Sequence, residues 1–278
     1  MFDMHHTIQH HHIPGPVGML SVLEQGPSQG PAIVMSHSIL SSSMMWAQQA
    51  ELLAACGWHV LRADIRGHGD SEAGCAPYVM DDLVADTIAV LDAFQIERAH
   101  YVGLSLGAMS GFGLGILHPE RVLSLLLCDG RADMPEALGA MWTERIDAAR
   151  AHGCGVLAVP TTERWFGKAF LDAHPENATR FQDAVGHTQV DGFVGCAQAI
   201  QTLNYLPQVA NIQAPTTLLV GANDGPLPQV MTALRDVMAN AQLEVIANSG
   251  HLPNIDQPTA FNAALMRHFF NTPTWSKP

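Results

Sequence analysis

Short apolar runs alternate with longer amphipathic stretches along most of this chain, beginning near residue 19. The short runs predict strands, whereas stretches with apolar residues at helical spacing predict helices. Because the strands are apolar throughout and are separated by helices, we expect a parallel sheet covered on both faces, an α/β fold. The predicted strands span residues 19–23, 32–35, 59–63, 100–104, 122–128, 216–220 and 243–246, and the predicted helices span residues 46–56, 80–94, 106–117, 227–238 and 258–270.

The alternation stops in the middle of the chain. Helical periodicities at residues 142–151, 161–170 and 193–203 follow one another there without a convincing strand. A helical block between two strands of one sheet is predicted to lie over the carboxyl edge of that sheet, where ligands bind in open α/β sheets. We therefore expect a core of residues 1–130 and 207–278 and a helical cap of residues 131–206.

Composition and charge exclude several classes of protein. The 278 residues are 47% hydrophobic and 14% charged, which predicts a large buried core rather than disorder. The longest strongly apolar stretch, residues 122–128, is too short to cross a bilayer, and histidines stand where a signal peptide has its apolar region. A net charge of −13 disfavours nucleic acid and anionic membrane surfaces as partners. We expect a cytoplasmic protein.

Cysteine and histidine usage adds little chemistry. The five cysteines are widely spaced and form no CxxC pair, so we expect reduced thiols that mostly fill the core, and no zinc site. A histidine run near the N-terminus has no carboxylate or cysteine beside it, so a solvated edge strand or a leader is favoured over a loose metal site. The run consists of His5, His6, His10, His11 and His12.

A candidate nucleophile stands between a predicted strand and a predicted helix. The pentapeptide Gly103-Leu104-Ser105-Leu106-Gly107 is a G-x-S-x-G. A sharp strand-to-helix turn strains the backbone of its central residue, and glycines at both ends let the turn close. The serine would project above the sheet at a helix N-terminus, whose dipole favours developing negative charge. This context favours Ser105 as a nucleophile over a glycine-rich turn with an idle serine.

A serine hydroxyl needs a base, and the base needs an acid that fixes its tautomer. His251 lies in a loop between the last predicted strand and the last predicted helix. Asp224 follows the strand at 216–220 and completes the chain order Ser, Asp, His. Asp129, directly after the neighbouring strand, is the alternative acid, and chain order favours Asp224.

The remaining candidates concern the oxyanion and the substrate. Two backbone N–H groups should bind the oxyanion, and we expect them from Leu106 and Ile39. His37 is either a pocket residue or a plain loop residue. Trp142 and Trp165 pack in the core or line the pocket. None of this chemistry requires a metal or an organic cofactor.

Several segments together resemble the α/β-hydrolase superfamily, and more narrowly the 3-oxoadipate enol-lactonases. The resemblance spans essentially residues 19–270. It implies a hydrolase with a Ser105, His251 and Asp224 triad, a small-molecule substrate and a role in aromatic degradation. The segments are S-H-S-I, L-R-A-D-I-R-G-H-G-D-S, G-L-S-L-G, E-R-W-F-G-K-A-F and H-L-P-N-I-D-Q-P.

The resemblance favours a serine hydrolase that opens a lactone or cleaves an ester. Where enol-lactonases usually have an Asn-Thr pair, this chain has Asp129-Gly130-Arg131, and Arg131 is a candidate partner for a substrate carboxylate. A hydrolase of carbon–carbon bonds in ring-cleavage products is the alternative enzyme. A ligand receptor with slow turnover is the alternative from another class.

Overall fold

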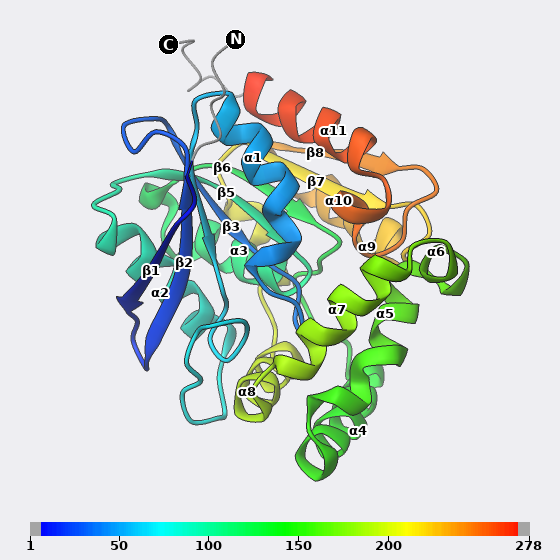
Figure 1. Cartoon of the computed structure of the whole chain (residues 1–278). Helices are drawn as coiled ribbons and strands as arrows, with labels where there is room; N and C mark the ends of the chain where they lie inside the picture. The colour runs from blue at the N-terminus through cyan, green and yellow to red at the C-terminus, as the bar shows by residue number, and fades with distance from the viewer. Residues whose placement is uncertain (1–6, 272–278) are drawn as a thin grey trace.

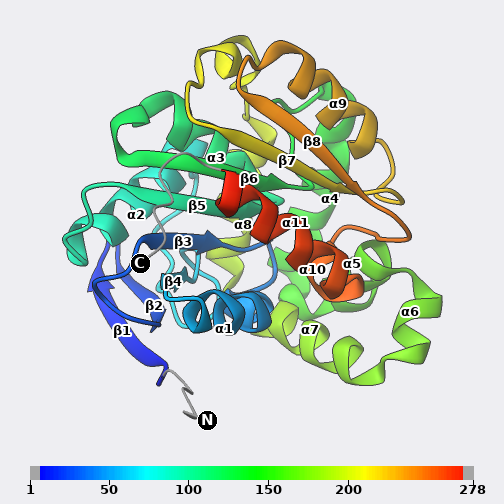
Figure 2. The same ribbon diagram turned by 90° about the horizontal axis from the view of Figure 1, so that it is seen from above.

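A single eight-stranded sheet forms the centre of the protein (Figures 1 and 2). The computed structural model describes residues 7–271. The strand order is β1-β2-β4-β3-β5-β6-β7-β8; β1 pairs antiparallel with β2 and β2 antiparallel with β4, and every other neighbouring pair is parallel. The strands are β1 (Gln9–Pro14), β2 (Met19–Gln25), β3 (Ala32–Ser36), β4 (His59–Ala63), β5 (Ala99–Leu104), β6 (Val122–Cys128), β7 (Thr216–Gly221) and β8 (Ala241–Ile246).

Helices cover both faces of this sheet, as the apolar strands predicted. Figure 1 shows α1 and α11 in front of the sheet and α2 and α3 behind it. The strands between these layers, β3, β5 and β7, are buried along their whole length. The α-helices of the two layers are α1 (Ala47–Ala55), α2 (Met80–Ala93), α3 (Leu106–Leu117), α9 (Leu227–Val237), α10 (Pro253–Asp256) and α11 (Pro258–Asn271), and short 3₁₀ helices are η1 (Ser43–Trp46), η2 (Pro119–Arg121) and η4 (Leu206–Asn211).

The chain between β6 and β7 is helical, as expected, and gathers at one end of the sheet (Figure 1). We call α4 to α8 the helical insertion, because β6 and β7 are neighbours in the sheet. The division into a core and a separate cap stays a prediction. The insertion contains α4 (Glu136–His152), η3 (Cys154–Leu157), α5 (Ala158–Phe166), α6 (Lys168–Ala173), α7 (Pro175–His187) and α8 (Val190–Gln201).

Two details of the insertion differ from the sequence prediction. The helix expected over 161–170 is two helices, because Gly167 adopts φ +77° and separates α5 from α6. Helix α7 was not predicted at all. Its buried residues are Phe181 and Val185, too few to give a clear apolar stripe.

The N-terminal histidines form part of an edge strand. His10 to His12 lie in β1, where His10 bonds to Ser21 and His11 to Glu24 at 2.8 Å each. His5 and His6 lie outside the described residues. The edge strand, one of the two forms favoured for the histidine run, is therefore the one that the structure shows.

Neither a disulfide nor a membrane span is found in the part of the chain that the structure describes. All five cysteines are free, and three of them are buried: Cys128, Cys154 and Cys196. Among residues 7–271, no helix combines the length and the apolarity that a bilayer crossing requires.

Candidate active site

The G-x-S-x-G turn joins β5 to α3 as a tight elbow. Ser105 adopts φ 57° and ψ −110°, a conformation that side chains rarely occupy. A Cβ on Gly103 would stand 2.2 Å from the carbonyl oxygen of Gly107, and a Cβ on Gly107 would stand 2.4 Å from that of Ser36. Any side chain at either position would therefore clash with the backbone. This is why the G-x-S-x-G pattern predicts such a turn.

The elbow places Ser105 directly before the first residue of α3. Its N–H donates to the Cys128 carbonyl at the end of β6, and 6% of the residue is exposed. The helix dipole at this end favours negative charge beside the serine.

Asp224 and His251 meet through two loops at the carboxyl ends of β7 and β8. The His251 Nδ1 and the Asp224 Oδ2 are 2.5 Å apart, and both residues are buried. The loops pack so closely that a Cβ on Gly221 would stand 1.9 Å from the Gly250 carbonyl oxygen. The Asn223 N–H also donates to the Ser249 carbonyl. The pairing of acid and histidine thus depends on backbone contacts between their loops.

A partly buried carboxylate and the helical insertion hold the His251 loop. Asp256, in α10, accepts hydrogen bonds from the Ser249 hydroxyl and the Gly250 N–H, both at 2.6 Å. The His251 N–H donates to the Trp165 carbonyl at the end of α5. The histidine is therefore positioned by the core and by the insertion together.

The electrostatics keep His251 neutral and Asp224 ionised. Burial lowers the pKa of His251 below 6.5, and the Asp224 charge only partly opposes this. Burial acts to raise the pKa of Asp224, but the interaction with His251 outweighs it and lowers that pKa. The His251 Nδ1–H then donates to Asp224, which leaves the lone pair of Nε2 free to take a proton.

The buried Nε2 atom of His251 has no hydrogen-bond partner among the described residues, so Ser105 is not bonded to it. The structure brings Asp224 and His251 together but does not form the Ser105–His251 bond. Such bonds are often long without substrate and tighten in the complex.

Asp129 lies beside this pair without bonding to the histidine. It is completely buried at the end of β6, and its Oδ1 accepts the Gly221 N–H at 2.9 Å. One ligand atom each from Asp129, Asp224 and His251 lie within 4.8 Å of one another. The geometry favours Asp224 as the acid that orients His251.

These three groups do not fit a metal ion. The Asp224 Oδ2 and the His251 Nδ1 share a hydrogen bond and are 2.5 Å apart. Two atoms that each bind a tetrahedral ion at about 2.0–2.2 Å are farther from each other than 2.5 Å. The three groups are instead a hydrogen-bonded Asp224–His251 pair and a neighbouring carboxyl group, that of Asp129.

The two N–H groups expected to bind the oxyanion have no acceptor in the part of the chain that the structure describes. They belong to Ile39, in the loop after β3, and Leu106, at the start of α3. That loop lies against the elbow, because the Gly107 N–H donates to the His37 carbonyl at 3.1 Å. Leu106 directly follows Ser105, and the loop that carries Ile39 contacts the same elbow; binding of an oxyanion by these two groups stays a prediction.

The His37 side chain does not line a pocket, contrary to one of the two roles considered for it. Its ring has no exposed surface; Nδ1 donates to the Ser38 carbonyl and Nε2 accepts the Ile65 N–H. Burial lowers the pKa of His37 to about 4, so the ring is neutral. Through these two hydrogen bonds the His37 ring connects the loop that carries Ile39 to the turn after β4.

The tryptophans and Arg131 are each engaged with the protein. Trp165 is 1% exposed and packs against Phe166 and Phe181 inside the insertion, so its ring belongs to the core. Trp142 is buried beneath the Arg145 guanidinium, 5.2 Å from the ring centroid. The Arg131 Nε donates to the Asp133 carbonyl at 2.5 Å, so a substrate carboxylate there would compete with Asp133.

Sequence reasoning missed two arginines of the insertion. The Arg164 Nη1 lies 3.9 Å from the Asp224 Oδ1, and Arg145 donates to the Thr161 hydroxyl. Both lower the pKa of His251 through their charge. Within residues 7–271, Arg145 has no carboxylate partner and its buried Nε has no acceptor. Their only sequence signal was nearness to Trp142 and Trp165, the two aromatic candidates.

A second serine–histidine contact lies among the strands β5 to β7 and α11. The Ser124 hydroxyl bonds to the His268 Nε2 at 2.8 Å, and the His268 Nδ1 bonds to the Thr217 hydroxyl. Asp224 bonds to His251 and not to this histidine. Burial lowers the pKa of His268 to about 3, so the cluster acts as neutral hydrogen bonding between α11 and the sheet.

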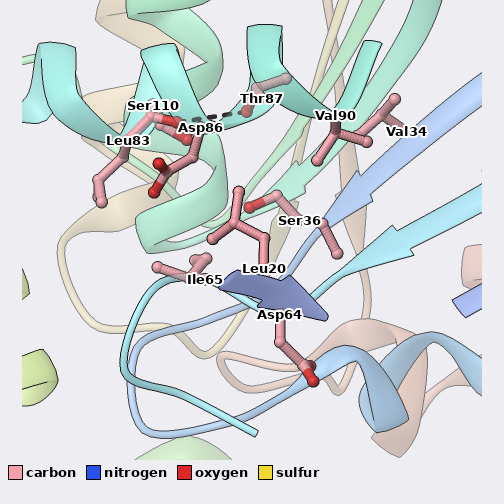
Figure 3. A pocket seen from close by; sticks show the side chains of 11 residues that line it. Leu20, Val34, Ser36, Asp64, Ile65, Leu83, Asp86, Thr87, Val90 and Ser110 are labelled. Carbon is pink, nitrogen blue, oxygen red and sulfur yellow. Dashed lines mark hydrogen bonds between the residues drawn. The ribbon is translucent and has the colours of Figure 1, made fainter. Parts of the chain in front are cut away.

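A small cavity behind β3 is separate from these residues (Figure 3). Its volume of ≈ 20 Å³ is room for about one water molecule. Figure 3 shows its walls, which come from β2 to β4, α2 and α3 and include Leu20, Ser36, Leu83, Asp86, Thr87 and Ser110. The cavity is too small for an organic substrate.

Comparison with known proteins assigns the family. The profile of the alpha/beta hydrolase fold matches residues 31–258, a range that holds the elbow and both loops of the Asp224–His251 pair. The chain belongs to the α/β hydrolase family. The sequence resemblance to this family is thereby confirmed.

Individual members of this family resemble the α/β hydrolase described here over most of its length. 3-Oxoadipate enol-lactonase 2 of Acinetobacter baylyi is 31% identical over 242 residues, covering 86% of this chain and 89% of the relative. The structure of the enol-lactonase from Burkholderia xenovorans LB400 superposes with a TM-score of 0.89 at 28% identity, covering 95% and 100% of the two chains. A 2-hydroxy-6-oxononadienedioate/2-hydroxy-6-oxononatrienedioate hydrolase of Burkholderia vietnamiensis is 28% identical, covering 84% and 85%.

Proposed function

We propose that this α/β hydrolase opens a small lactone, or cleaves a carboxylic ester, through Ser105, His251 and Asp224. The observation that carries the proposal is the buried Asp224–His251 pair, whose Nε2 is left free to take a proton. The strained elbow that presents Ser105 supports it. Similarity to enol-lactonases in sequence and structure supports the lactone as substrate.

The reaction proceeds through an acyl-enzyme. The Ser105 oxygen attacks the carbonyl carbon while its proton passes to the His251 Nε2. The Leu106 and Ile39 N–H groups stabilise the oxyanion. His251 then protonates the leaving oxygen, which in a lactone stays tethered to the acyl group. Water, deprotonated by His251, attacks the acyl carbon, and the proton returns to Ser105. An enol released in this way tautomerises to a ketone.

We further propose that the substrate carries a carboxylate. Arg145 is a partly buried cation without a carboxylate partner in residues 7–271. Burial together with the charge of Arg164 lowers its pKa to about 10, so the side chain is still charged at neutral pH. A buried charge without a partner is costly, so an anionic ligand beside it would be stabilised. The relatives named as 3-oxoadipate enol-lactonases support such a substrate.

A substrate panel tests the activity. Simple lactones, p-nitrophenyl esters and a carboxylated enol-lactone are each incubated with the protein, and products are identified. A hydroxy acid from a simple lactone, an acid and p-nitrophenol from an ester, or a keto acid from the enol-lactone supports the proposal. A ring-cleavage product is offered as well, and its carbon–carbon scission into two fragments would instead support the alternative that the ring-cleavage hydrolase relative suggests. Slow single-turnover hydrolysis with ligand-induced protein binding would indicate a receptor. Cytoplasmic location and aromatic degradation stay predictions.

Arg145→Gln should weaken binding of the anionic substrate. We expect KM for a carboxylated lactone to rise by about tenfold or more, because a hydrogen bond to a charged group contributes roughly 1.5–3 kcal/mol. KM for a neutral ester should stay unchanged. Arg150→Gln, an exposed arginine on the same helix, is the matched control. A KM increase with Arg131→Ala and none with Arg145→Gln would move the anchor to Arg131.

The pH dependence of kcat/KM should follow the neutral form of His251. Activity should be lost as the pH falls through the pKa of His251, and this acid limb should lie below 6.5, because burial lowers that pKa. Initial rates between about pH 4 and 9 measure it. An acid limb clearly above 6.5 would contradict the neutral, buried histidine.

A further inference from the structure

Asp129 is a buried carboxyl group that the reaction steps above do not use. It has no exposed surface, and its Oδ2 accepts no hydrogen bond from the described residues. Its Oδ1 accepts the Gly221 N–H. The Asp224 carboxylate is its neighbour. If the Asp129 carboxyl group carries a proton, its hydroxyl can donate a hydrogen bond in addition to the one that its Oδ1 accepts.

Two adjacent buried carboxylates cannot both stay ionised at low cost, so the pair holds one proton. The surroundings decide which group holds it. His251 and Arg164 both face Asp224 and favour its charge. Asp129 is faced by the neutral Gly221 N–H, by the thiol of Cys128, and by the negative charges of Asp224 and Asp256. These surroundings favour the proton on Asp129 over Asp224.

We propose that Asp129 is a neutral carboxylic acid whose hydroxyl donates a hydrogen bond to Asp224, so that it positions the Asp224 carboxylate against His251. The pKa values agree: burial, with the Asp224 charge, raises that of Asp129 well above its usual value. Asp129 is a positioning residue, because it acts through Asp224. This inference rests on the proposed role of the Asp224–His251 pair.

The backbone at Asp129 also points to a requirement for its side chain. Its φ is +47°, in the left-handed region that favours glycine. Its N–H donates to the Leu219 carbonyl of β7, so the residue is fixed to the strand that leads to Asp224. A strained aspartate where glycine would be relaxed indicates that the carboxyl group has a use.

Asp129→Asn and Asp129→Ala separate the possibilities. The asparagine amide can donate to Asp224 and its oxygen can accept from Gly221, and it is neutral. We therefore expect kcat within about threefold of wild type and an unchanged acid limb of kcat/KM. In Asp129→Ala the Asp224 charge loses a donor, so the acid limb should move to higher pH and kcat should fall by about tenfold or more.

Other outcomes would overturn the proposal. If Asp129 were ionised, Asp129→Asn would remove a negative charge near His251 and move the acid limb to lower pH by about one unit. If Asp129 were the acid that orients His251, Asp129→Asn would abolish turnover while Asp224→Asn retained it. Thermal unfolding of both variants shows whether an activity loss reflects misfolding.

Infrared spectroscopy tests the protonation without any substrate. The wild type should show a carboxylic-acid C=O band at neutral pH that Asp129→Asn removes. An identical band in both proteins would reject the proposal. The infrared band does not depend on turnover, so it tests the protonation of Asp129 even if the substrate panel gives no hydrolysis. Failure of the proposed activity can therefore be distinguished from failure of the proposed protonation.

Discussion

Replacing Ser105 with alanine is expected to reduce kcat for lactone or ester hydrolysis by about 10⁶-fold, because no acyl-enzyme can form. Binding should persist, since the N–H groups of Leu106 and Ile39 and the Arg145 cation are untouched. Steady-state rates with enzyme in high concentration measure the residual activity, and mass spectrometry should find an acyl adduct on Ser105 in the wild type only.

Ser124→Ala is the matched control, because Ser124 also bonds to a histidine. It removes a buried hydrogen bond, so we expect a lower melting temperature with kcat per folded molecule close to wild type. A large loss of kcat in Ser124→Ala with none in Ser105→Ala would make the Ser124–His268 pair the reactive one and reject the proposed site.

Asp224→Asn is expected to lower kcat by about 10⁴-fold. The amide group cannot replace an ionised carboxylate that both accepts the His251 Nδ1–H and stabilises the imidazolium formed in the reaction. The wrong tautomer would place a proton on Nε2, where a lone pair is needed. The loss should appear in kcat more than in KM, since Asp224 lies behind the histidine. Parallel rates for Asp129→Asn provide the comparison.

A normal rate for Asp224→Asn would contradict this assignment, whatever the rate of Asp129→Asn. Nuclear magnetic resonance supplies a second check. The His251 Nδ1–H of the wild type should give a strongly deshielded proton signal, because its hydrogen bond to Asp224 is short and buried. Asp224→Asn should remove that signal, and Ser105→Ala should keep it.

Much of the fold followed from local pattern. The strands His59–Ala63 and Val122–Cys128 and the helix Leu106–Leu117 have the bounds that the apolar runs predicted, because each is buried along most of its length. Where burial is sparse the prediction failed. Helix α7 presents little apolar surface, and a single glycine, Gly167, divides a helix whose periodicity continues across it.

For the candidate site as well, local sequence pattern predicted some features and missed others. Ser105 could be nominated because its elbow depends on glycines two residues away on either side, Gly103 and Gly107. His251 and Asp224 could be nominated from their order in the chain. Asp129 could be nominated as the alternative acid because it follows the neighbouring strand. Nothing local shows that the Arg164 guanidinium approaches Asp224, because this contact joins segments that are far apart in the sequence.

The amino-acid sequence was sufficient for the class of fold, the strand-to-helix turn at Ser105 and the family, since strand and helix periodicity and a glycine-flanked serine are short-range properties of the chain. Tertiary structure decided which carboxylate bonds to the histidine and that the His37 ring joins two loops instead of lining a pocket. It also decided that Arg145 is a partly buried cation without a carboxylate partner in residues 7–271. These properties arise from desolvation and from distances between loops, and both exist only once the chain has folded.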